Sequence, residues 1–432
     1  MHHSITIAIL AVLAACTFAA PTRSWSSPHR TFRVPVKPRV GVYRTPRQEM
    51  MRTYAKFGWE IITFDPSALG LSGGDGTSSS TAPAATSSPA TAPAANISSA
   101  VDSTLATSTT TGVTGEVTAT PETNESEYLE LVTIGGQTLS LDFDTGSSDL
   151  WVFSNKLASS QSSGHTSYDP SRSSTWSSYQ GASWSIQYGD GSSASGSVGY
   201  DKVSIGGATV NKQCVELAEE VSGSFITDTN SDGLLGLGFG TINTVKPQKQ
   251  KTFFENVMPS LAQPLFTADL KDNASGTYTF GEIDPSQYSG DIEWTSIDNS
   301  NGFWEFGSKS YSVNGKTYQC TTCNSVIADT GTSLIMVDDD IVKNYYGQIP
   351  SAKLSQQQGG YIYDCSAQLP PIGFQIGQGE QITYAPLGDG TCFGGVQSNN
   401  GGDLQIFGDM LLKNFFAIFD GGNKTFGIAA KA

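Results

Sequence analysis

Histidine is scarce in this chain, and its scarcity excludes several kinds of catalysis. Only four of the 432 residues are histidine, and only His165 lies after residue 112. Ser-His-Asp and Cys-His catalysis both need a histidine beside the nucleophile. His165 lies in the polar stretch "SGHTSYDP", where an ordinary surface role is the commoner interpretation. We therefore do not expect histidine-dependent catalysis.

Residue clusters that would hold a metal ion or a phosphate group are also missing. Zinc sites favour groups of histidine and cysteine, and Cys320 and Cys323 have no second pair at zinc-finger spacing. The stretch "GLGFG" lacks the lysine of a Walker-type phosphate loop. The sequence therefore predicts neither a metal nor another cofactor.

Positive charge is rare in the main part of the chain. Residues 1–110 contain nine Lys and Arg against five Asp and Glu, whereas the whole chain has a net charge of −16. The remaining 322 residues thus carry a net charge of −20, with Arg172 as their only arginine. Such an acidic body repels nucleic acid and anionic lipid, so we expect neither as a partner. This excess of acidic residues suits a protein that works at low pH, or it serves only to keep the protein soluble.

Long apolar runs are absent as well. No internal run approaches the roughly 18 residues of a membrane-spanning helix. Residues 5–20 form a short apolar run ending in small residues, which predicts a secretory signal peptide at residues 1–20. The sequence ends at Ala432 without a hydrophobic tail, so a lipid anchor is not expected. We expect a secreted, extracellular protein with no membrane anchor.

What the chain does contain favours an all-β fold. It has 47 Gly, 21 Phe and 16 Tyr with only 15% charged residues, which suits short strands and many turns. Residues 138–144 alternate between apolar and polar side chains, as a half-buried strand does, and follow a Gly-Gly turn at Gly135 and Gly136. Residues 326–328 read as a buried strand. Helices are predicted only at residues 338–346 and, more weakly, at residues 252–261.

The region before residue 113 has a different character. The basic segment that follows the signal peptide runs from residue 21 to about residue 71. Residues 72–112 are almost entirely Ser, Thr, Ala, Gly and Pro, a composition that buries too little apolar surface to fold. We expect this tract to be a disordered linker.

One triplet, Asp-Thr-Gly, occurs twice, beginning at Asp144 and Asp329, each time after apolar residues. Each copy is followed by an apolar pair and glycine, 89 residues later in "GLLGLG" and 76 residues later in "QIFGDMLL". This spacing indicates two lobes that each present one aspartate. Two close carboxylates share one proton, so one can act as base while the other acts as acid. Glycosidases also use two carboxylates but give no reason for a duplicated triplet.

From Glu116 to Ala432 the chain resembles the pepsin-like aspartic endopeptidases, particularly the secreted fungal aspergillopepsin and penicillopepsin type. The resemblance rests on "SEYLELVTIGGQTLSLDFDTGSSDLWVFS", "WSIQYGDGSSASG", "DGLLGLGFG", "IADTGTSLI" and "IFGDMLLKNFFAIFD". It implies an all-β, bilobal, double-ψ β-barrel fold with a deep active-site cleft and a β-hairpin flap. The N-terminal lobe with the flap would span residues 113–297 and the C-terminal lobe residues 298–432.

The resemblance also assigns roles to individual residues. Asp144 and Asp329, here called the aspartate pair, would be catalytic. Thr145 and Thr330 would hydrogen-bond across the base of the cleft. Further support would come from Gly146, Ser147, Gly331, Thr332 and Trp151, the last beneath the flap tyrosine. The flap and substrate-binding residues would be Tyr188, Gly189, Asp190 and Ser192, of which Asp190 and Ser192 would help to accept a lysine before the scissile bond.

Cysteine and asparagine residues suggest covalent features. Cys365 and Cys392 match the single disulfide of the fungal type. Cys320 and Cys323 form either a short bridge or two free thiols, and Cys214 is expected to be a buried thiol. Glycosylation sequons begin at Asn124, Asn273 and Asn423, and at Asn96 in the precursor only.

The resemblance gives residues 21–112 a role as a basic propeptide with a Ser/Thr/Ala/Pro-rich linker. Such propeptides inhibit their own enzyme by placing a lysine on the aspartate pair, and here Lys37 and Lys56 are both candidates. We therefore expect a monomeric, pepstatin-sensitive acid endopeptidase, made as a zymogen, that cleaves proteins and peptides beside hydrophobic residues. The alternative is a catalytically inactive pepsin-fold binding or inhibitor protein, which the presence of both aspartates and the flap tyrosine disfavours.

Overall fold

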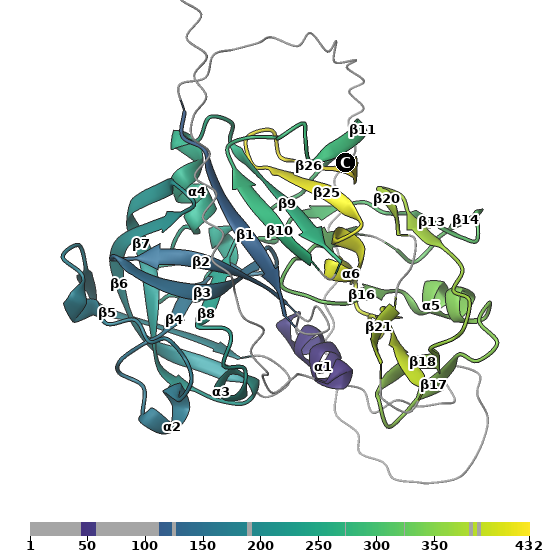
Figure 1. Ribbon diagram of the computed structural model, residues 1–432, viewed down its shortest axis with the longest axis horizontal. Helices are drawn as coiled ribbons and strands as arrows, with labels where there is room; N and C mark the ends of the chain where they lie inside the picture. The colour runs from purple at the N-terminus through teal and green to yellow at the C-terminus, as the bar shows by residue number, and fades with distance from the viewer. Residues whose placement is uncertain are drawn as a thin grey trace, which may run out of the picture. The chain divides into compact units, whose positions relative to one another are not determined.

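The computed structural model describes residues 45–57, 112–122, 127–187, 192–272, 274–323, 325–379, 383–386 and 390–432. All of them belong to one compact unit, residues 41–432. Strands dominate these residues and helices are few and short, which confirms the all-β fold class (Figure 1). The predicted signal peptide at residues 1–20 and the tract at residues 72–111 lie outside the described residues.

Thirteen strands of the described chain form its largest sheet, in the order β11-β26-β25-β9-β10-β1-β2-β3-β8-β4-β7-β6-β5. Strands β9 and β25 are neighbours, so residues on both sides of the expected lobe boundary at residue 297 join in one sheet. The bounds are β1 (Gly115–Pro121), β2 (Tyr128–Ile134), β3 (Gln137–Asp144), β4 (Leu150–Phe153), β5 (Ser177–Gln187), β6 (Ser193–Ile205), β7 (Ala208–Val221), β8 (Gly233–Gly236), β9 (Leu265–Lys271), β10 (Ala274–Phe280), β11 (Tyr288–Ser296), β25 (Phe415–Asp420) and β26 (Thr425–Lys431).

The hairpin between β2 and β3 forms where the sequence predicts it. Ile134 pairs with Gln137, which leaves a two-residue turn at Gly135 and Gly136 with φ angles of 53° and 83°. Positive φ at both turn positions favours glycine. The expected alternation of β3 holds only beside this turn, because the last four side chains of the strand, from Leu141 to Asp144, are all buried.

Three smaller sheets contain the remaining strands of the described residues. The five-stranded sheet has the order β12-β15-β24-β16-β23, and the two four-stranded sheets have the orders β14-β13-β19-β20 and β17-β18-β22-β21. The bounds are β12 (Glu305–Phe306), β13 (Ser310–Val313), β14 (Lys316–Gln319), β15 (Ser325–Ala328), β16 (Ile335–Val337), β17 (Lys353–Ser355), β18 (Gly360–Asp364), β19 (Ile372–Phe374), β20 (Gly377–Gly379), β21 (Thr383–Pro386), β22 (Thr391–Gly394), β23 (Val396–Ser398) and β24 (Leu404–Phe407).

The two Asp-Thr-Gly triplets lie in matching strand arrangements. Strand β3 pairs in parallel with β8, β8 pairs antiparallel with β4, and β4 pairs in parallel with β7. Strand β15 pairs in parallel with β24, β24 antiparallel with β16, and β16 in parallel with β23. The strands β8 and β24 carry the two apolar-pair-and-glycine motifs. The duplication inferred from these motifs is therefore confirmed.

Six α-helices lie within the described residues, and one of the predicted helices forms as expected. Helix α5 occupies almost all of residues 338–346 and is followed by Gly347. The helix predicted at residues 252–261 is shorter: Thr252 and Glu255 form a capping box, but α4 ends at Val257 and a 3₁₀ turn follows. Pro259 has no N–H to continue the α-helical ladder. The bounds are α1 (Pro46–Lys56), α2 (Ser159–Ser162), α3 (Ser224–Thr227), α4 (Phe253–Val257), α5 (Asp339–Tyr346) and α6 (Asp409–Leu412).

Helix α1, purple in Figure 1, lies in the basic segment, where no helix is expected from the sequence. Thr45 and Gln48 cap it reciprocally: the Gln48 N–H donates to Thr45 Oγ1 at 3.3 Å, and the Thr45 N–H donates to Gln48 Oε1 at 2.7 Å. Pro46 occupies the first turn, which needs no donor. Met50 and Tyr54 are almost fully buried, so packing against the body stabilises this short helix.

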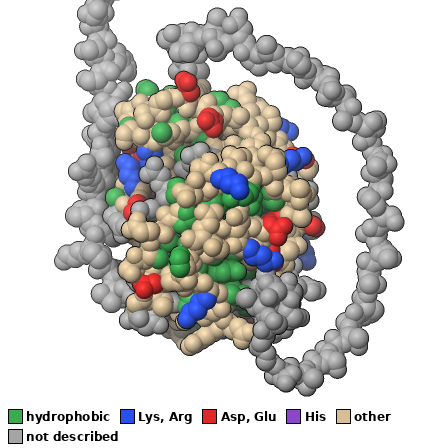
Figure 2. All heavy atoms as spheres, turned by 90° about the vertical axis from the view of Figure 1, so that its right-hand side faces the viewer, with side chains coloured by type: hydrophobic (Ala, Val, Ile, Leu, Met, Phe, Trp, Pro, Cys, Tyr) green, Lys and Arg blue, Asp and Glu red, His purple; other side chains and the backbone are tan. Residues whose placement is uncertain are grey.

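The surface of the described chain carries both signs of charge. On the face in Figure 2, Lys and Arg side chains are interspersed with Asp and Glu and do not gather into one patch. A helix long and apolar enough to cross a membrane does not occur among the described residues.

Candidate active site

The fold brings the two triplet aspartates together, although they are 185 positions apart in the chain. Asp144 ends β3, and Asp329 follows β15 directly. Both are buried, and both contact one ammonium group: Lys56 Nζ lies 2.6 Å from Asp144 Oδ1 and 2.9 Å from Asp329 Oδ2. A single nitrogen that bonds both carboxylates requires them to be close neighbours.

Each carboxylate receives two hydrogen bonds from its own loop, in matching positions. The Gly146 N–H donates to Asp144 Oδ1 at 2.8 Å, and the Ser147 hydroxyl donates to Asp144 Oδ2 at 2.6 Å. The Gly331 N–H and the Thr332 hydroxyl donate to the corresponding oxygens of Asp329 at 3.1 and 2.5 Å. Hydrogen bonds of this kind fix the carboxylate planes and stabilise the ionised form.

The two loops are also bonded to each other through their threonines. The Thr330 N–H donates to Thr145 Oγ1 at 3.0 Å, and the Thr145 N–H donates to Thr330 Oγ1 at 3.2 Å. Each hydroxyl then donates to a carbonyl of the opposite strand, Thr145 to Ala328 and Thr330 to Phe143. The crossed bonds hold the two loops at one separation.

Glycine is required in both triplets by the close approach of the opposite aspartate. A Cβ atom on Gly146 would lie 2.5 Å from Asp329 Oδ1, and one on Gly331 would lie 2.3 Å from Asp144 Cγ. Both distances are far shorter than van der Waals contact, and the atoms they meet belong to short, hydrogen-bonded side chains. Any larger residue would push the aspartate pair apart.

Burial and the neighbouring ammonium act in opposite directions on the aspartate pair. Burial alone would raise the pKa of Asp144, but the Lys56 ammonium and the Ser147 hydroxyl outweigh it and lower that pKa. Burial and the negative charge of Asp144 raise the pKa of Asp329 in spite of Lys56. Burial would lower the pKa of Lys56, yet the two carboxylates raise it. Asp144 therefore loses its proton more readily than Asp329 does.

Helix α1 supplies a second cation, Arg52, one helical turn before Lys56. The Arg52 guanidinium bonds Glu127 Oε1 and lies 3.6 Å from Asp142 Oδ2. Residues four apart on a helix are separated by about 6 Å, close to the roughly 6.7 Å between residues two apart on a strand. The spacing of the two cations of α1 therefore matches the spacing of Asp142 and Asp144 on β3. This correspondence was not predicted from the sequence.

Other residues of α1 bind to the surrounding chain. The Tyr54 hydroxyl donates to the Ser398 carbonyl at 2.9 Å, and Arg47 Nη1 donates to the Gln357 carbonyl at 2.9 Å. Of the two candidate lysines, Lys56 contacts the aspartate pair, while Lys37 lies outside the described residues. The capping signal of Thr45 and Gln48, followed by Arg52 and Lys56 at a spacing of four, was available in the sequence and would have predicted this helix.

The structure describes only part of the predicted flap. Tyr188, Gly189 and Asp190 lie outside the described residues, so their roles stay predictions. Ser192 is buried, and its hydroxyl lies 2.8 Å from the Ser224 hydroxyl. Trp151 is fully buried, stacked on Trp184 and edge-on to Phe225.

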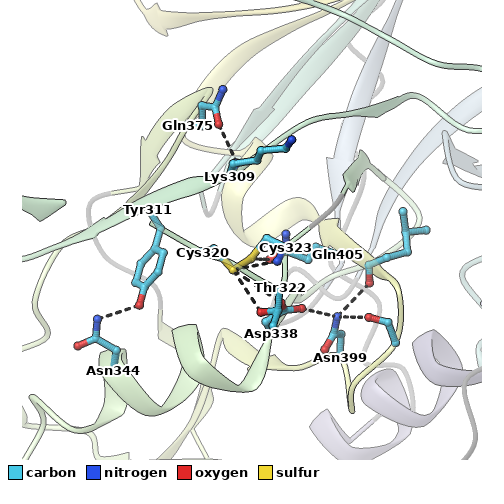
Figure 3. The surroundings of a disulfide bond; sticks show 12 residues. Lys309, Tyr311, Cys320, Thr322, Cys323, Asp338, Asn344, Gln375, Asn399 and Gln405 are labelled. Carbon is cyan, nitrogen blue, oxygen red and sulfur yellow. Dashed lines mark hydrogen bonds between the residues drawn. A yellow bond between two sulfur atoms is a disulfide. The ribbon is translucent and has the colours of Figure 1, made fainter. Parts of the chain in front are cut away.

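Both cysteine pairs are bonded. Cys365 joins Cys392, and Cys320 joins Cys323. Figure 3 shows Asp338 and Asn399 beside the shorter bridge, with Asp338 Oδ2 3.7 Å from Cys320 Sγ. Cys214 is buried and outside any disulfide of the described chain, and burial raises the pKa of its thiol.

Two groups of possible metal ligands occur among the described residues, but both are engaged otherwise. In the group of Cys320, Cys323 and Asp338 the sulfur atoms are bonded to each other. In the group of Glu122, Glu127 and Asp228, the Arg52 guanidinium occupies Glu127. Neither arrangement presents a set of free donor atoms to a cation.

His165 and Asn423 were also singled out from the sequence. The His165 ring stacks on Phe153 with centroids 3.8 Å apart, and its Nδ1 lies 2.8 Å from the Ser231 carbonyl oxygen. These contacts describe a packing role for the histidine. Asn423 is exposed in the turn between β25 and β26, whereas Asn96, Asn124 and Asn273 lie outside the described residues.

Comparison with known proteins agrees with this geometry. The family model for eukaryotic aspartyl protease matches residues 127–431. Aspergillopepsin-1 of Aspergillus pseudoglaucus is 49% identical over 325 residues, which cover 74% of this chain and 82% of the relative. Penicillopepsin-1 of Penicillium janthinellum is 49% identical over 325 residues, which cover 74% of this chain and 99% of the relative.

Proposed function

Because the chain belongs to the eukaryotic aspartyl protease family, we propose that it is a secreted acid endopeptidase with Asp144 and Asp329 as its catalytic pair. The observation that carries this proposal is the arrangement of two buried carboxylates on one ammonium group, each with the same two donors from its own loop. The chain is all-β and bilobal, as expected of this family.

The proposed reaction uses the single proton that the aspartate pair holds at acidic pH. The ionised carboxylate takes a proton from a water molecule as the water oxygen attacks the peptide carbonyl carbon, and the protonated carboxyl group gives its proton to the carbonyl oxygen. The tetrahedral intermediate then collapses as its C–N bond breaks: the leaving nitrogen takes the proton that the first carboxylate removed from water, and the other carboxylate takes a proton from a hydroxyl of the intermediate. The Ser147 and Thr332 hydroxyls hold the carboxylate planes in place throughout.

We further propose that the described chain is the zymogen, with residues 21–112 as its propeptide. Support comes from Lys56, which occupies both carboxylates so that a water molecule cannot be activated between them. Acid protonates the carboxylates, removes the attraction for Lys56 and frees the pair. The segment that inhibits the enzyme at neutral pH is then cleaved away by the enzyme itself.

The place of Arg52 supports acceptance of a basic side chain near the scissile bond. Its guanidinium lies beside Asp142, within 5.9 Å of the Phe225 ring centroid, in space that α1 would vacate after activation. A substrate lysine or arginine entering this space would meet the same carboxyl group and the same aromatic ring. Peptides that differ only by Lys against Leu before the scissile bond measure this preference through kcat/KM.

Secretion and glycosylation complete the proposal. Residues 1–20 would direct export, and Asn423 is an exposed sequon in a surface turn. Mass spectrometry of the secreted protein before and after glycosidase treatment locates both the new N-terminus and any glycan.

The deciding experiment is hydrolysis of denatured haemoglobin at about pH 3.5, where an aspartate pair holds one proton, with and without pepstatin. We expect pepstatin to abolish the activity and Asp144→Asn to reduce it by at least about 10³-fold, since the variant has no base. Activity that persists in Asp144→Asn would refute the assignment. A folded parent protein that binds peptides without cleaving them would instead support an inactive binding protein.

A further inference from the structure

One pair of cysteines lies beside oxygen atoms that the proposed function does not use. Cys320 and Cys323 have the C-x-x-C spacing of zinc ligands, but they have no second pair at zinc-finger spacing, so the sequence predicts no metal site there. The fold supplies oxygen donors in place of that second pair. Asp338 at the start of α5 and Gln405 on β24 lie against the two sulfur atoms, as Figure 3 shows.

The oxygen atoms lie from the sulfur atoms at the distances that separate two ligands of one zinc ion. Asp338 Oδ2 is 3.7 Å from Cys320 Sγ, and Gln405 Oε1 is 3.5 Å from Cys323 Sγ. In a tetrahedral site with Zn–S of about 2.3 Å and Zn–O of about 2.0 Å, a sulfur and an oxygen ligand are about 3.5 Å apart. Only the bond between the two sulfur atoms therefore separates this arrangement from a set of four zinc ligands.

Asp338 is directed toward the sulfur atoms and not toward the helix that it precedes. It occupies the N-cap position of α5, yet its side chain makes no capping hydrogen bond. Asn399 Nδ2 donates to Asp338 Oδ1 at 3.1 Å, while Oδ2 faces Cys320. Ligating carboxylates are oriented by such hydrogen bonds from a neighbouring residue. Asp338 is thus held in the manner of a metal ligand.

Donor groups also surround the sulfur atom of Cys320. The Cys323 N–H donates to Cys320 Sγ at 3.1 Å, and the Thr322 hydroxyl lies 3.6 Å from the same sulfur. Hydrogen bonds to a charged group favour its charged form, here the thiolate that binds a metal ion. Cys320 and Asp338 are partly exposed, so an ion can reach them from the surface.

We propose that these four side chains form a zinc site whenever the bridge is absent. The members of this site, here called the four-ligand site, are Cys320, Cys323, Asp338 and Gln405. A small thiol reduces the bridge by giving it two electrons and two protons and becomes a disulfide itself, and Zn²⁺ then replaces the two thiol protons. A small disulfide reverses the reaction, because the bond between the sulfur atoms removes the thiolates that hold the ion. The proposal does not depend on the proposed function.

The other bridge of the described chain provides an internal control. Cys365 and Cys392 are also bonded to each other. Among the described residues, no group of possible metal ligands contains either of them. Reduction of this longer bridge should therefore create no metal site.

The first test compares two variants of the full chain at about pH 7, where metal ions displace protons from thiols. One variant carries Cys365→Ser and Cys392→Ser, the other Cys320→Ser and Cys323→Ser, and both retain Cys214. Each is treated with a phosphine, which reduces disulfides, and titrated with Co²⁺, whose thiolate complexes absorb light. We expect one bound Co²⁺ per chain in the first variant only, and only after reduction. Zn²⁺ should displace it, because zinc binds such sites more tightly than cobalt does.

Two results of this titration would overturn the proposal. In the first, the reduced chain that retains Cys320 and Cys323 gives no cobalt–thiolate absorption. In the second, the absorption persists in the variant that lacks both of these cysteines. If the variant without the longer bridge does not fold, as judged by circular dichroism, the parent chain takes its place.

The second test replaces the carboxylate ligand in the reduced chain. Asp338→Asn should weaken Zn²⁺ binding at least about tenfold, because the variant loses the charge and the oriented oxygen that face Cys320. Asp340→Asn, an exposed aspartate in the first turn of α5, is the matched control and should change the affinity less than about twofold. Equal affinities in the two variants would refute the four-ligand site. A chain that binds zinc in this way but cleaves no protein would refute only the proposed function.

Discussion

Lys56 is the residue whose replacement tests the proposed inhibitory role of α1 most directly. Its Nζ lies 2.6 Å from Asp144 Oδ1, 2.9 Å from Asp329 Oδ2 and 3.0 Å from Asp329 Oδ1, and its side chain is only 6% exposed. Removing one partner of a buried ion pair costs about 3–5 kcal/mol, because the remaining charge stays buried without compensation. In Lys56→Gln the equilibrium for release of α1 should therefore shift by about 10² to 5 × 10³-fold.

The pH dependence of the contact between Lys56 and Asp144 determines in which direction the activation pH should change. Burial would raise the pKa of Asp144, but Lys56 lowers it, so the contact stabilises the closed chain above the ordinary aspartate pKa of about 4. That stabilisation is lost as the pH falls through the lowered pKa. The parent chain should therefore activate only in acid, and Lys56→Gln should activate at a higher pH.

The assay follows cleavage of the full chain and hydrolysis of a fluorogenic peptide after incubation at stepped pH values. Arg47→Gln is the control, because Arg47 is exposed on the same helix and makes one hydrogen bond, to the Gln357 carbonyl. We expect the activation midpoint to move in Lys56→Gln and to remain in place in Arg47→Gln. Equal midpoints for Lys56→Gln and the parent chain would show that the ammonium does not hold α1 in place.

Four further variants test the construction of the site and of the fold. Gly331→Ala places a methyl group about 2.3 Å from Asp144 Cγ, and kcat/KM should fall at least about 10²-fold while thermal unfolding by circular dichroism shows an overpacking cost of about 1–3 kcal/mol. Thr145→Val removes the hydroxyl that bonds the opposite loop and should cost about 1–3 kcal/mol in urea unfolding at acidic pH. Replacing both cysteines of the Cys365–Cys392 bridge, which spans 27 positions, should cost about 3.5 kcal/mol in the same assay, against about 2 kcal/mol for the bridge that spans three. An equal loss for the two bridges would contradict the chain-entropy account.

The aspartate pair was predictable because its signal is local and occurs twice. Asp144 and Asp329 each stand in a triplet whose glycine and following hydroxyl residue have a direct geometric role. Helix α5 was equally clear, with acidic residues at its start and Gly347 at its end.

The remaining features depend on packing between distant segments. Asp142 occupies a polar position in an alternating strand, yet it is fully buried beneath Arg52 of α1, 90 positions earlier in the chain. The choice between Lys37 and Lys56 depended on the contact of Lys56 with the aspartate pair, which joins α1 to segments far along the chain. The length of α4 was overestimated because the effect of Pro259 was not weighed against the capping box.

The crossed threonines have a consequence for how such a site can be assembled. Each Asp-Thr-Gly loop finds the acceptor for its hydroxyl only on the strand that leads to the other loop. In a fragment with a single triplet, the aspartate would be exposed to solvent. The threonine of that triplet would lack the carbonyl to which its hydroxyl donates in the whole chain. The site therefore forms only when both halves of the chain are folded and in contact. A fragment that contains one half of this chain should have none of the activity of the whole.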